Sequence, residues 1–583
     1  MKKVKLFSFA LAALMLGACT SEDVIDNGGQ TVLPGEKGYI SLGINLPTTP
    51  SSRALNDQFD KGDPSEYVVN DATLLIFNGA NEADATFNAA YSLTEFSTTD
   101  PTAGNITTSF KVTKEITKPG SGNVYAMVIV NDNGLLTGDN TTGWTLAGTS
   151  LTGKKFSEVN DIKLPSSADA AVDASTFTTN GFFMTNAPLY TGEGGTTKPN
   201  GEVTTLTEID ANNIFSTEAE AETNPAANIY VERAVAKVSV TPTSDNNYVT
   251  DTKAGNAVIT GWALDVTNQS TYVVRNTVGA NWWDLTADNI NYRFVGQIPV
   301  ATGLFRTYWA YDPNYTAWGG NFDDNFNYLK GTISESDLLG TDENGYCLEN
   351  TFDVANQNQN QTTRVIVAAK LNGGNDFYVV NNAKGTIYTK IEDIKDVIAA
   401  EYLANPIVRE ALKSLAAGKT LDKSKLTITF DKVKEDNGGD MPVSEIEIND
   451  ASIFEGNAIP DELTKDGNTD IIDAINNAKK VSYYKGGIAY YPVMIQHFGQ
   501  ELTPWDATTV GGTSYPDNNA SKWLGRYGVL RNNWYDISVT SINSIGSAEV
   551  PTVTGTPDDP VESWISVKIN VLSWAKRTQE VGL

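Results

Sequence analysis

The stretch that decides the predicted fold is Gly38-Tyr39-Ile40-Ser41-Leu42-Gly43-Ile44-Asn45-Leu46-Pro47. Apolar side chains occupy every second position in it, at Ile40, Leu42, Ile44 and Leu46. A period of two is typical of a β-strand with one buried face. Pro47 ends the pattern, because proline has no backbone N–H to donate to a neighbouring strand. The sequence therefore predicts a half-buried strand near the start of the chain.

A possible cleavage site follows this strand. The polar stretch Ser51-Ser52-Arg53-Ala54 is expected to be exposed. A strand that is joined to the body only by such a linker can be cut loose at the Arg53–Ala54 bond. Its loss would leave a groove with unpaired backbone groups, which another strand can fill. We therefore interpret the strand of Ile40, Leu42, Ile44 and Leu46 as removable.

An N-terminal targeting segment precedes the strand. Lysines at positions 2, 3 and 5 are followed by an apolar run at 6–16, which is too short to span a bilayer as a helix. The run ends in Leu16-Gly17-Ala18-Cys19, which looks like a bacterial lipobox. We expect residues 1–18 to be a lipoprotein signal peptide, Cys19 to carry the lipid, and 19–53 to form a lipidated propeptide. An ordinary secretory signal with an incidental cysteine is the alternative.

Composition limits the possible functions. The 583 residues include 71 Asp and Glu against 42 Lys and Arg, a net charge of −29. Such an acidic chain is a poor partner for nucleic acid. The two cysteines, Cys19 and Cys347, leave no intrachain disulfide if Cys19 is lipidated, so we expect Cys347 to be a small buried residue. No cofactor or metal is expected.

Strand-like runs fill most of the remaining chain, which indicates a mostly β protein. In the first part they lie at 72–77, 109–112, 124–130, 181–186 and 229–240, and a plausible linker follows at 241–247. In the second part they lie at 258–262, 272–274, 488–495, 534–542 and 564–574. Helical patterns at 391–398, 406–415 and 470–479 interrupt the second part, and Asn405-Pro406 is expected to cap the middle helix.

Several segments in this order resemble one known family. They are the lipobox, the alternating strand before Arg53, and 124–134, 182–186, 231–240, 527–535 and 567–583. Together they resemble the Bacteroidales fimbrillins, the subunits of type V pili, and look most like the stalk subunit of the short (minor) fimbriae. The resemblance implies two transthyretin-like β-sandwich domains, which we place at 54–243 and 244–583, with short helical inserts in the second.

The resemblance also implies an assembly pathway. The precursor would reach the outer membrane as a lipoprotein, and an Arg-directed protease would cut it between Arg53 and Ala54. The C-terminal tail of the next copy would then fill the vacated groove by strand addition and extend a head-to-tail filament. The expected donor residues are Leu572, Trp574, Val581 and Leu583. Implied partners are other copies, tip and anchor pilins, the protease, and a host or bacterial receptor for adhesion, biofilm growth or colonisation at the cell surface.

Other function classes stay open on the sequence alone. An enzyme needs a site, and the single histidine, His497, is more typical of a structural residue. A glycosidase with two carboxylates is not excluded by chemistry. A monomeric surface lipoprotein that binds glycan is a further alternative, with sugar-stacking candidates Trp282, Trp283, Trp309 and Trp318. A pilus tip or anchor subunit is the last alternative.

We expect Cys19→Ala to abolish labelling of the protein by a fatty-acid probe in growing cells, because one thiol carries the lipid. Cys347→Ala is the matched control and should keep the label. Label retained on the Cys19→Ala protein would contradict the lipoprotein assignment.

Overall fold

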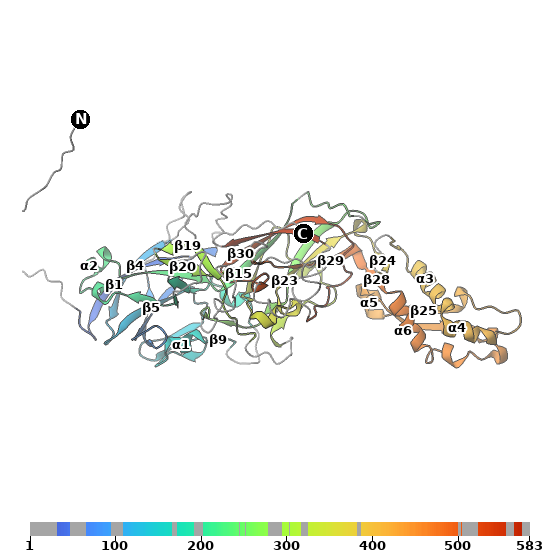
Figure 1. Ribbon diagram of the computed structural model, residues 1–583, viewed down its shortest axis with the longest axis horizontal. Helices are drawn as coiled ribbons and strands as arrows, with labels where there is room; N and C mark the ends of the chain where they lie inside the picture. Colours follow the sequence, from blue (N-terminus) through green and yellow to red (C-terminus); the bar gives the residue numbers. More distant parts are fainter. Residues whose placement is uncertain are drawn as a thin grey trace, which may run out of the picture.

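The computed structural model describes residues 32–46, 66–94, 109–165, 172–191, 202–243, 245–250, 252–277, 294–301, 303–315, 324–381, 386–498, 503, 523–555 and 565–573. The molecule is elongated and mostly β, as predicted (Figure 1). No described helix combines the length and apolarity that a bilayer span needs.

An eight-stranded sheet forms one end of the molecule (Figure 1). Its order is β3-β2-β5-β10-β14-β1-β4, with β13 also paired to β5. The strands are β1 (Lys37–Asn45), β2 (Ala72–Gly79), β3 (Thr86–Leu93), β4 (Ser109–Thr117), β5 (Asn123–Val130), β10 (Met184–Asn186), β13 (Thr207–Ile209) and β14 (Ala227–Arg233). Beside it lie the short helix α1 (Phe156–Asn160) and a small sheet of β6 (Leu136–Asp139), β7 (Gly143–Leu146) and β8 (Thr149–Ser150).

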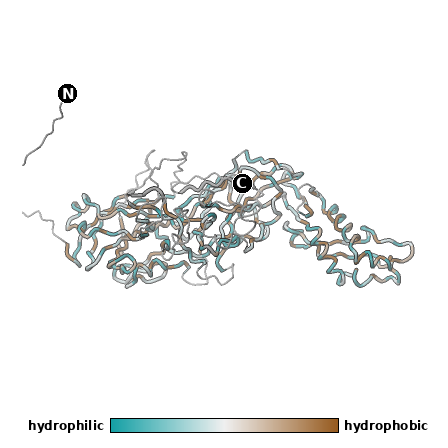
Figure 2. The backbone as a smooth tube through the Cα atoms, in the orientation of Figure 1, coloured by the Kyte–Doolittle hydropathy of each residue, from teal (hydrophilic) through white to brown (hydrophobic). Residues whose placement is uncertain are grey.

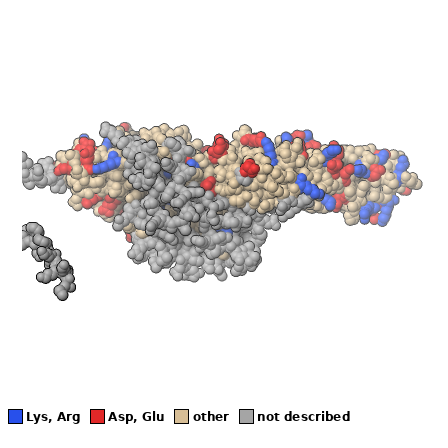
Figure 3. All heavy atoms as spheres, turned by 90° about the horizontal axis from the view of Figure 1, so that it is seen from above, with Lys and Arg blue, Asp and Glu red and all other residues tan. Residues whose placement is uncertain are grey.

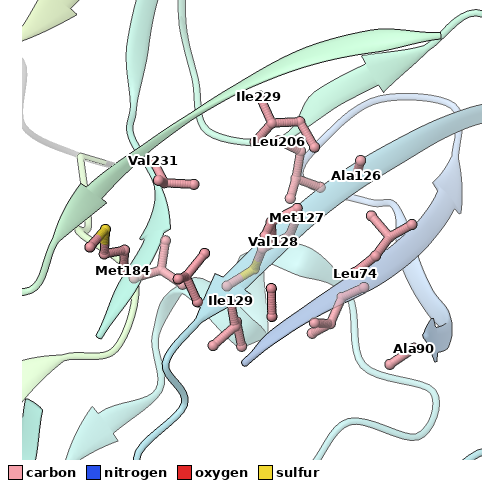
Figure 4. Packing of buried hydrophobic residues seen from close by; sticks show 14 of the residues in the cluster. Leu74, Ala90, Ala126, Met127, Val128, Ile129, Met184, Leu206, Ile229 and Val231 are labelled. Carbon is pink, nitrogen blue, oxygen red and sulfur yellow. The ribbon is translucent and has the colours of Figure 1, made fainter. Parts of the chain in front are cut away.

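Strand β5 lies inside this sheet, as its apolar run predicts. Every residue of β5 after Asn123 is buried, because β2 and β10 flank it and both faces are covered. Figure 4 shows β5 side chains packed among residues of β2, β10 and β14. The strand ends in a turn where Asn131, Asn133 and Gly134 have φ of 52°, 51° and 79°, which Asn and Gly adopt most readily.

Two further sheets enclose a second core. The first has the order β22-β15-β30-β31, and the second β16-β23-β29. Their strands are β15 (Val235–Pro242), β16 (Val258–Asp265), β22 (Asn344–Leu348), β23 (Arg364–Lys370), β29 (Ile488–Met494), β30 (Asn533–Ile542) and β31 (Ile565–Ser573). The predicted late strands are thus confirmed in position.

An insert with its own apolar core projects at the opposite end from β1 (Figures 1 and 2). It contains α3 (Ile391–Ala404), α4 (Pro406–Ala411), α5 (Lys432–Asn437), α6 (Thr469–Ala478), β24 (Phe377–Val380), β25 (Leu426–Phe430), β26 (Gly439–Asp440), β27 (Val443–Ile448) and β28 (Val481–Tyr484). The predicted cap is confirmed: the Asn405 side chain accepts a hydrogen bond from the Ile407 N–H, with Pro406 in the first turn.

The prediction of one strand over 229–240 is wrong. The stretch forms β14 and β15, which separate at Ala234 and join different sheets. The Ala234 N–H donates to the Phe183 carbonyl, while the Val235 carbonyl accepts from the Asn532 N–H at 2.8 Å. Residues from Val231 to Val240 are all buried, so no change in hydropathy marks the break.

Strands from before and after residue 243 also pair directly. A four-stranded sheet joins β12 (Glu202–Thr204) and β11 (Leu189–Thr191) to β20 (Leu304–Thr307) and β19 (Val295–Ala301). In addition, β9 (Lys163–Leu164) pairs with β18 (Thr271–Tyr272). A further short pair, β17 (Thr267–Asn268) with β21 (Phe326–Asn327), lies wholly after residue 243. The division into domains at 243 stays a prediction.

Buried charges lie where β14 continues into β15. The Lys237 ammonium contacts a Glu66 carboxylate oxygen at 2.5 Å, and the two side chains are 2% and 0% exposed. The Tyr346 hydroxyl donates to the same oxygen at 2.8 Å, and the Arg233 guanidinium donates to the Glu66 carbonyl. The Lys237 ammonium also lies 4.2 Å from the centre of the Trp534 ring. These contacts compensate charges that would otherwise be costly to bury.

We expect Glu66→Ala to lower the free energy of unfolding by about 3–5 kcal/mol, because it leaves the Lys237 ammonium buried without its counter-ion. Glu335→Ala is the control, since it breaks a largely exposed pair with Lys370 and should cost roughly 0–1 kcal/mol. Denaturant titration measures both. Equal effects of the two substitutions would contradict this account.

Candidate functional site

The predicted removable strand, β1, lies inside the first sheet between two neighbours. Nine residues from Lys37 to Asn45 pair with β4 in antiparallel register. Four of them, from Leu42 to Asn45, pair in parallel with β14 from Ala227 to Tyr230. Further along, the Tyr39 N–H and carbonyl bond to the Phe215 carbonyl and N–H at 2.7 and 2.9 Å. Backbone hydrogen bonds therefore hold β1 on both edges.

One face of β1 packs into the apolar core. The four alternating side chains predicted for this face are at most 2% exposed: Ile40, Leu42, Ile44 and Leu46. They belong to the same cluster as the side chains of β2, β5 and β14. The predicted buried face is thus confirmed. Burying each of these side chains contributes roughly 1.5–3 kcal/mol relative to leaving it exposed.

The opposite face of β1 is only partly covered, as predicted for a half-buried strand: Lys37 is exposed, and Tyr39, Gly43 and Asn45 are half-buried. Ser41 is 0% exposed, and its hydroxyl is buried without a hydrogen-bond partner among the described residues. The cover is the segment 214–226, which contains helix α2 (Glu218–Thr223) and lies against β1 and β4 (Figure 1). The Ala226 N–H donates to the Ser41 carbonyl at 2.8 Å. Strand β1 is therefore paired on both edges, buried on one face, and covered on the other face chiefly at Ser41.

Two glycines of β1 lie where the enclosure is tightest. A Cβ at Gly43 would lie 2.4 Å from the Asn228 Oδ1 atom on β14. A Cβ at Gly38 would lie 2.8 Å from Ile214 Cγ2 and 3.1 Å from the Phe215 carbonyl oxygen. The exposed Asn228 side chain can move aside at Gly43, whereas the Phe215 backbone limits the room at Gly38, so Gly38 is the more restricted position.

The start of β1 is exposed and carries charge. Lys37 pairs with Glu115 of β4, and the Tyr39 hydroxyl donates to the same carboxylate at 3.2 Å. The Lys37–Glu115 hydrogen bond raises the pKa of Lys37 and lowers the pKa of Glu115. Figure 3 shows acidic and basic side chains near one another at this end of the molecule. Such exposed pairs add little stability, so β1 depends on its ladder and its apolar face.

Sequence reasoning missed the cover over β1. Thr217 caps α2: its hydroxyl accepts from the Glu220 N–H and donates to the Glu220 carboxylate at 2.7 Å. The spacing Thr-x-x-Glu is the capping-box signal and would have predicted this helix start. The parallel pairing of β1 with β14 has no comparable local signal.

Of the remaining predicted site residues, the structure describes only Leu572. Leu572 lies in β31 opposite Trp534 of β30. Cys19, Arg53, Ala54, Trp574, Val581 and Leu583 lie outside the described residues.

Those of the residues considered for other functions that the structure describes are buried. Trp309 is 1% exposed and its indole N–H donates to the Phe352 carbonyl at 2.9 Å, so it offers no face to a sugar. Trp282, Trp283 and Trp318 lie outside the described residues. His497 is buried, with Nδ1 2.8 Å from the Tyr535 hydroxyl. Cys347 is buried as predicted, and burial raises the pKa of its thiol to about 12. In the described part of the chain, no three His, Cys, Asp or Glu side chains are grouped to hold a metal ion.

We expect Leu42→Ala in the full-length chain to lower the free energy of unfolding by about 2–5 kcal/mol, because it opens a cavity under an enclosed strand. Lys37→Ala on the same strand is the control and should cost less than about 1 kcal/mol. A Leu42→Ala effect as small as that of the control would show that β1 is not seated in the core.

The C-terminal part of the chain matches a known protein family. Residues 482–580 match the family model described as major fimbrial subunit protein type IV, fimbrillin, C-terminal. No curated protein sequence matches the chain.

Solved structures align over most of the chain with little sequence identity. A fimbrilin of Porphyromonas gingivalis W83 is 14% identical, with a TM-score of 0.34 over 93% of this chain and 99% of that one. A putative cell adhesion protein of Parabacteroides distasonis is 9% identical, with a TM-score of 0.35 over 93% and 99%. The tip fimbrial protein Mfa3 of P. gingivalis, with a C-terminal truncation, is 11% identical, with a TM-score of 0.28 over 91% and 99%. We draw no functional conclusion from likeness at this level. The match over 482–580 agrees with the predicted resemblance: in this region the chain is similar to the C-terminal part of the fimbrillins.

Proposed function

We propose that this chain is the structural subunit of a cell-surface pilus that polymerises by donor-strand exchange. The observation that carries the proposal is the place of β1 in the fold. It is the first described strand of the chain, yet it lies inside its sheet, paired with both β4 and β14. The family match over 482–580 agrees with this role.

The chain order makes β1 separable by a single cut. After Leu46, the next described residue is Glu66, and β2 starts at Ala72. Cleavage of the Arg53–Ala54 bond therefore disconnects β1 from the body without cutting between any other strands. An internal strand would need two cuts. This is the physical reason why the removable element is the first strand.

An emptied β1 site would have unpaired backbone groups on two strands. Five residues from Ser41 to Asn45 have register partners or backbone bonds on the β14 side, and all nine residues of β1 have partners on β4. Leaving buried N–H and carbonyl groups unpaired costs about 1–3 kcal/mol each. An apolar trough would also be exposed where Ile40, Leu42 and Ile44 had been. A strand from another copy can satisfy both needs at once.

The donor in this scheme is the tail that follows β31. Strand β31 pairs along its whole length with β30, so Leu572 is held in the sheet of its own subunit. The proposed donor segment follows Ser573, and its large apolar residues are Trp574, Val581 and Leu583. Filling one copy's groove with the next copy's tail gives an open head-to-tail polymer.

The rest of the pathway is part of the same proposal. Cys19 would anchor the precursor to the outer membrane, and an Arg-directed protease would release 54–583 to the growing pilus. The chain would be the stalk subunit of short fimbriae, built from two β-sandwich domains at 54–243 and 244–583. Tip and anchor pilins and a host or bacterial receptor would be its other partners. The role is structural and adhesive, without catalysis.

We expect Arg53→Ala to leave β1 in place and to keep the protein monomeric, because the uncut strand blocks the groove. Ser52→Ala is the matched control and should permit normal filaments. Electron microscopy of the cells and N-terminal sequencing of shed filaments provide the readout, with Ala54 as the expected first residue. Long filaments that still contain residues 40–46 would refute donor-strand exchange at this groove.

A further inference from the structure

A cleft lies at one end of the β16-β23-β29 sheet. Segments 328–331 and 549–555 line it, together with Asp265 at the end of β16 and Arg364 at the start of β23. Its volume is about 510 Å³, which is within the range of small-molecule sites. None of its described lining residues belongs to β1, β4 or β14. We call it the 549–555 cleft.

Arg364 brings a buried guanidinium group to this cleft. The residue is 3% exposed; its Nε donates to an Asp265 carboxylate oxygen at 2.7 Å, and its Nη2 donates to the Pro551 carbonyl at 2.5 Å. The other oxygen of Asp265 accepts from the Val266 and Leu329 N–H groups. The Nη1 group of Arg364 has no hydrogen-bond partner among the described residues and keeps some contact with solvent. It is therefore a donor available to a molecule in the cleft.

Asn360 supplies a second donor. The residue is 7% exposed, and its backbone is fixed: its N–H donates to the Thr554 carbonyl at 3.2 Å, and its carbonyl accepts from the Tyr328 hydroxyl at 2.6 Å. Its side-chain Nδ2 has no partner among the described residues and lies 3.8 Å from the position of a Cβ at Gly555, which lines the cleft. Two side chains that are more than nine-tenths buried thus direct unused N–H groups toward the cleft.

The walls of the cleft are largely apolar. Val550 is 4% exposed, and Leu329 and Val553 are half-buried. Val550 packs with Leu329 in one small apolar cluster, and Val553 packs against another. A ligand with an apolar body can therefore bury surface here, which favours binding.

The charged groups at the cleft leave one positive charge in excess. Arg364 pairs with Asp265, and Lys434 pairs with Glu549, so each pair is neutral. Lys330 adds one ammonium group among the described lining residues. The cleft is thus locally positive in a chain whose net charge is −29, and this favours an anionic ligand.

Donors, excess positive charge and apolar walls occur together in the chemistry of one ligand class. We propose that the 549–555 cleft binds a small organic acid. Its carboxylate accepts hydrogen bonds from Arg364 Nη1 and Asn360 Nδ2, and its apolar body lies against Leu329, Val550 and Val553. A polyhydroxylated sugar would instead need polar groups along the walls. The site does not depend on strand exchange, so the monomeric precursor can be tested.

Titration calorimetry on the full-length chain tests the ligand class with 3-phenylpropionate as the probe. We expect saturable binding at one site, about tenfold tighter than that of 3-phenylpropionamide, which has the same apolar body without the charge. Glucuronate, a carboxylate on a polar body, should also bind about tenfold more weakly, because the apolar walls contribute nothing to it. Equal binding of acid and amide would overturn the carboxylate, a preference for glucuronate would overturn the apolar body, and no binding of either acid would overturn the site.

Variants test the location. Asn360→Leu should weaken binding of 3-phenylpropionate about tenfold, because it removes one donor to a charged group without stranding a partner. Val553→Glu should abolish binding, because it places a carboxylate in the wall. Val249→Glu is the matched control: it adds the same charge at a residue that is 77% exposed and does not line the cleft, and it should bind as wild type does. Thermal melts check that each variant folds. Folded Asn360→Leu and Val553→Glu proteins that bind as tightly as the control would refute the site.

Discussion

The seating of β1 between β4 and β14 is the interaction on which the first sheet depends. Strand β4 has no other partner in the sheet order, so β1 is its link to β14. The inner face of β1 supplies Ile40, Leu42 and Ile44 to the core, and the 214–226 segment covers the outer face chiefly at Ser41. A strand that completes both a ladder and a core cannot be lost without replacement, because backbone pairing and apolar burial are lost together.

Hydrogen bonds and buried charges, more than apolar packing, fix the junction between the first sheet and the rest of the molecule. At Ala234 the chain passes from β14 to β15, and the turn toward the second sheet is fixed by Asn532 and Phe183 rather than by apolar packing alone. Lys237, Glu66 and Arg233 bury their charges at the same place. Buried pairs of this kind require defined geometry, since each charge is compensated only when its partner is in position. The junction therefore has a defined geometry at the point where the chain passes from the first sheet to the second.

The two ends of the molecule contain different structures. Strand β1 lies at one end of the molecule, and the insert at the other end has a separate core of residues from α3, α4, α6, β25 and β27. The two cores share no side chain, but β24 and β28 of the insert also contribute Phe377, Val379 and Tyr484 to the second core, so the base of the insert packs against the sandwich sheets.

The sequence by itself determined the local features of this protein. Alternation placed Ile40, Leu42, Ile44 and Leu46 on one buried face, the apolar run 124–130 indicated an interior strand, and Asn405-Pro406 marked a helix start. Only the tertiary structure decided that β1 lies between β4 and β14, that 229–240 divides at Ala234, and that Ser41 is as buried as its apolar neighbours. The reason is physical: periodicity reports which face of a strand is apolar, whereas the choice of neighbouring strands depends on hydrogen bonds between residues far apart in the chain.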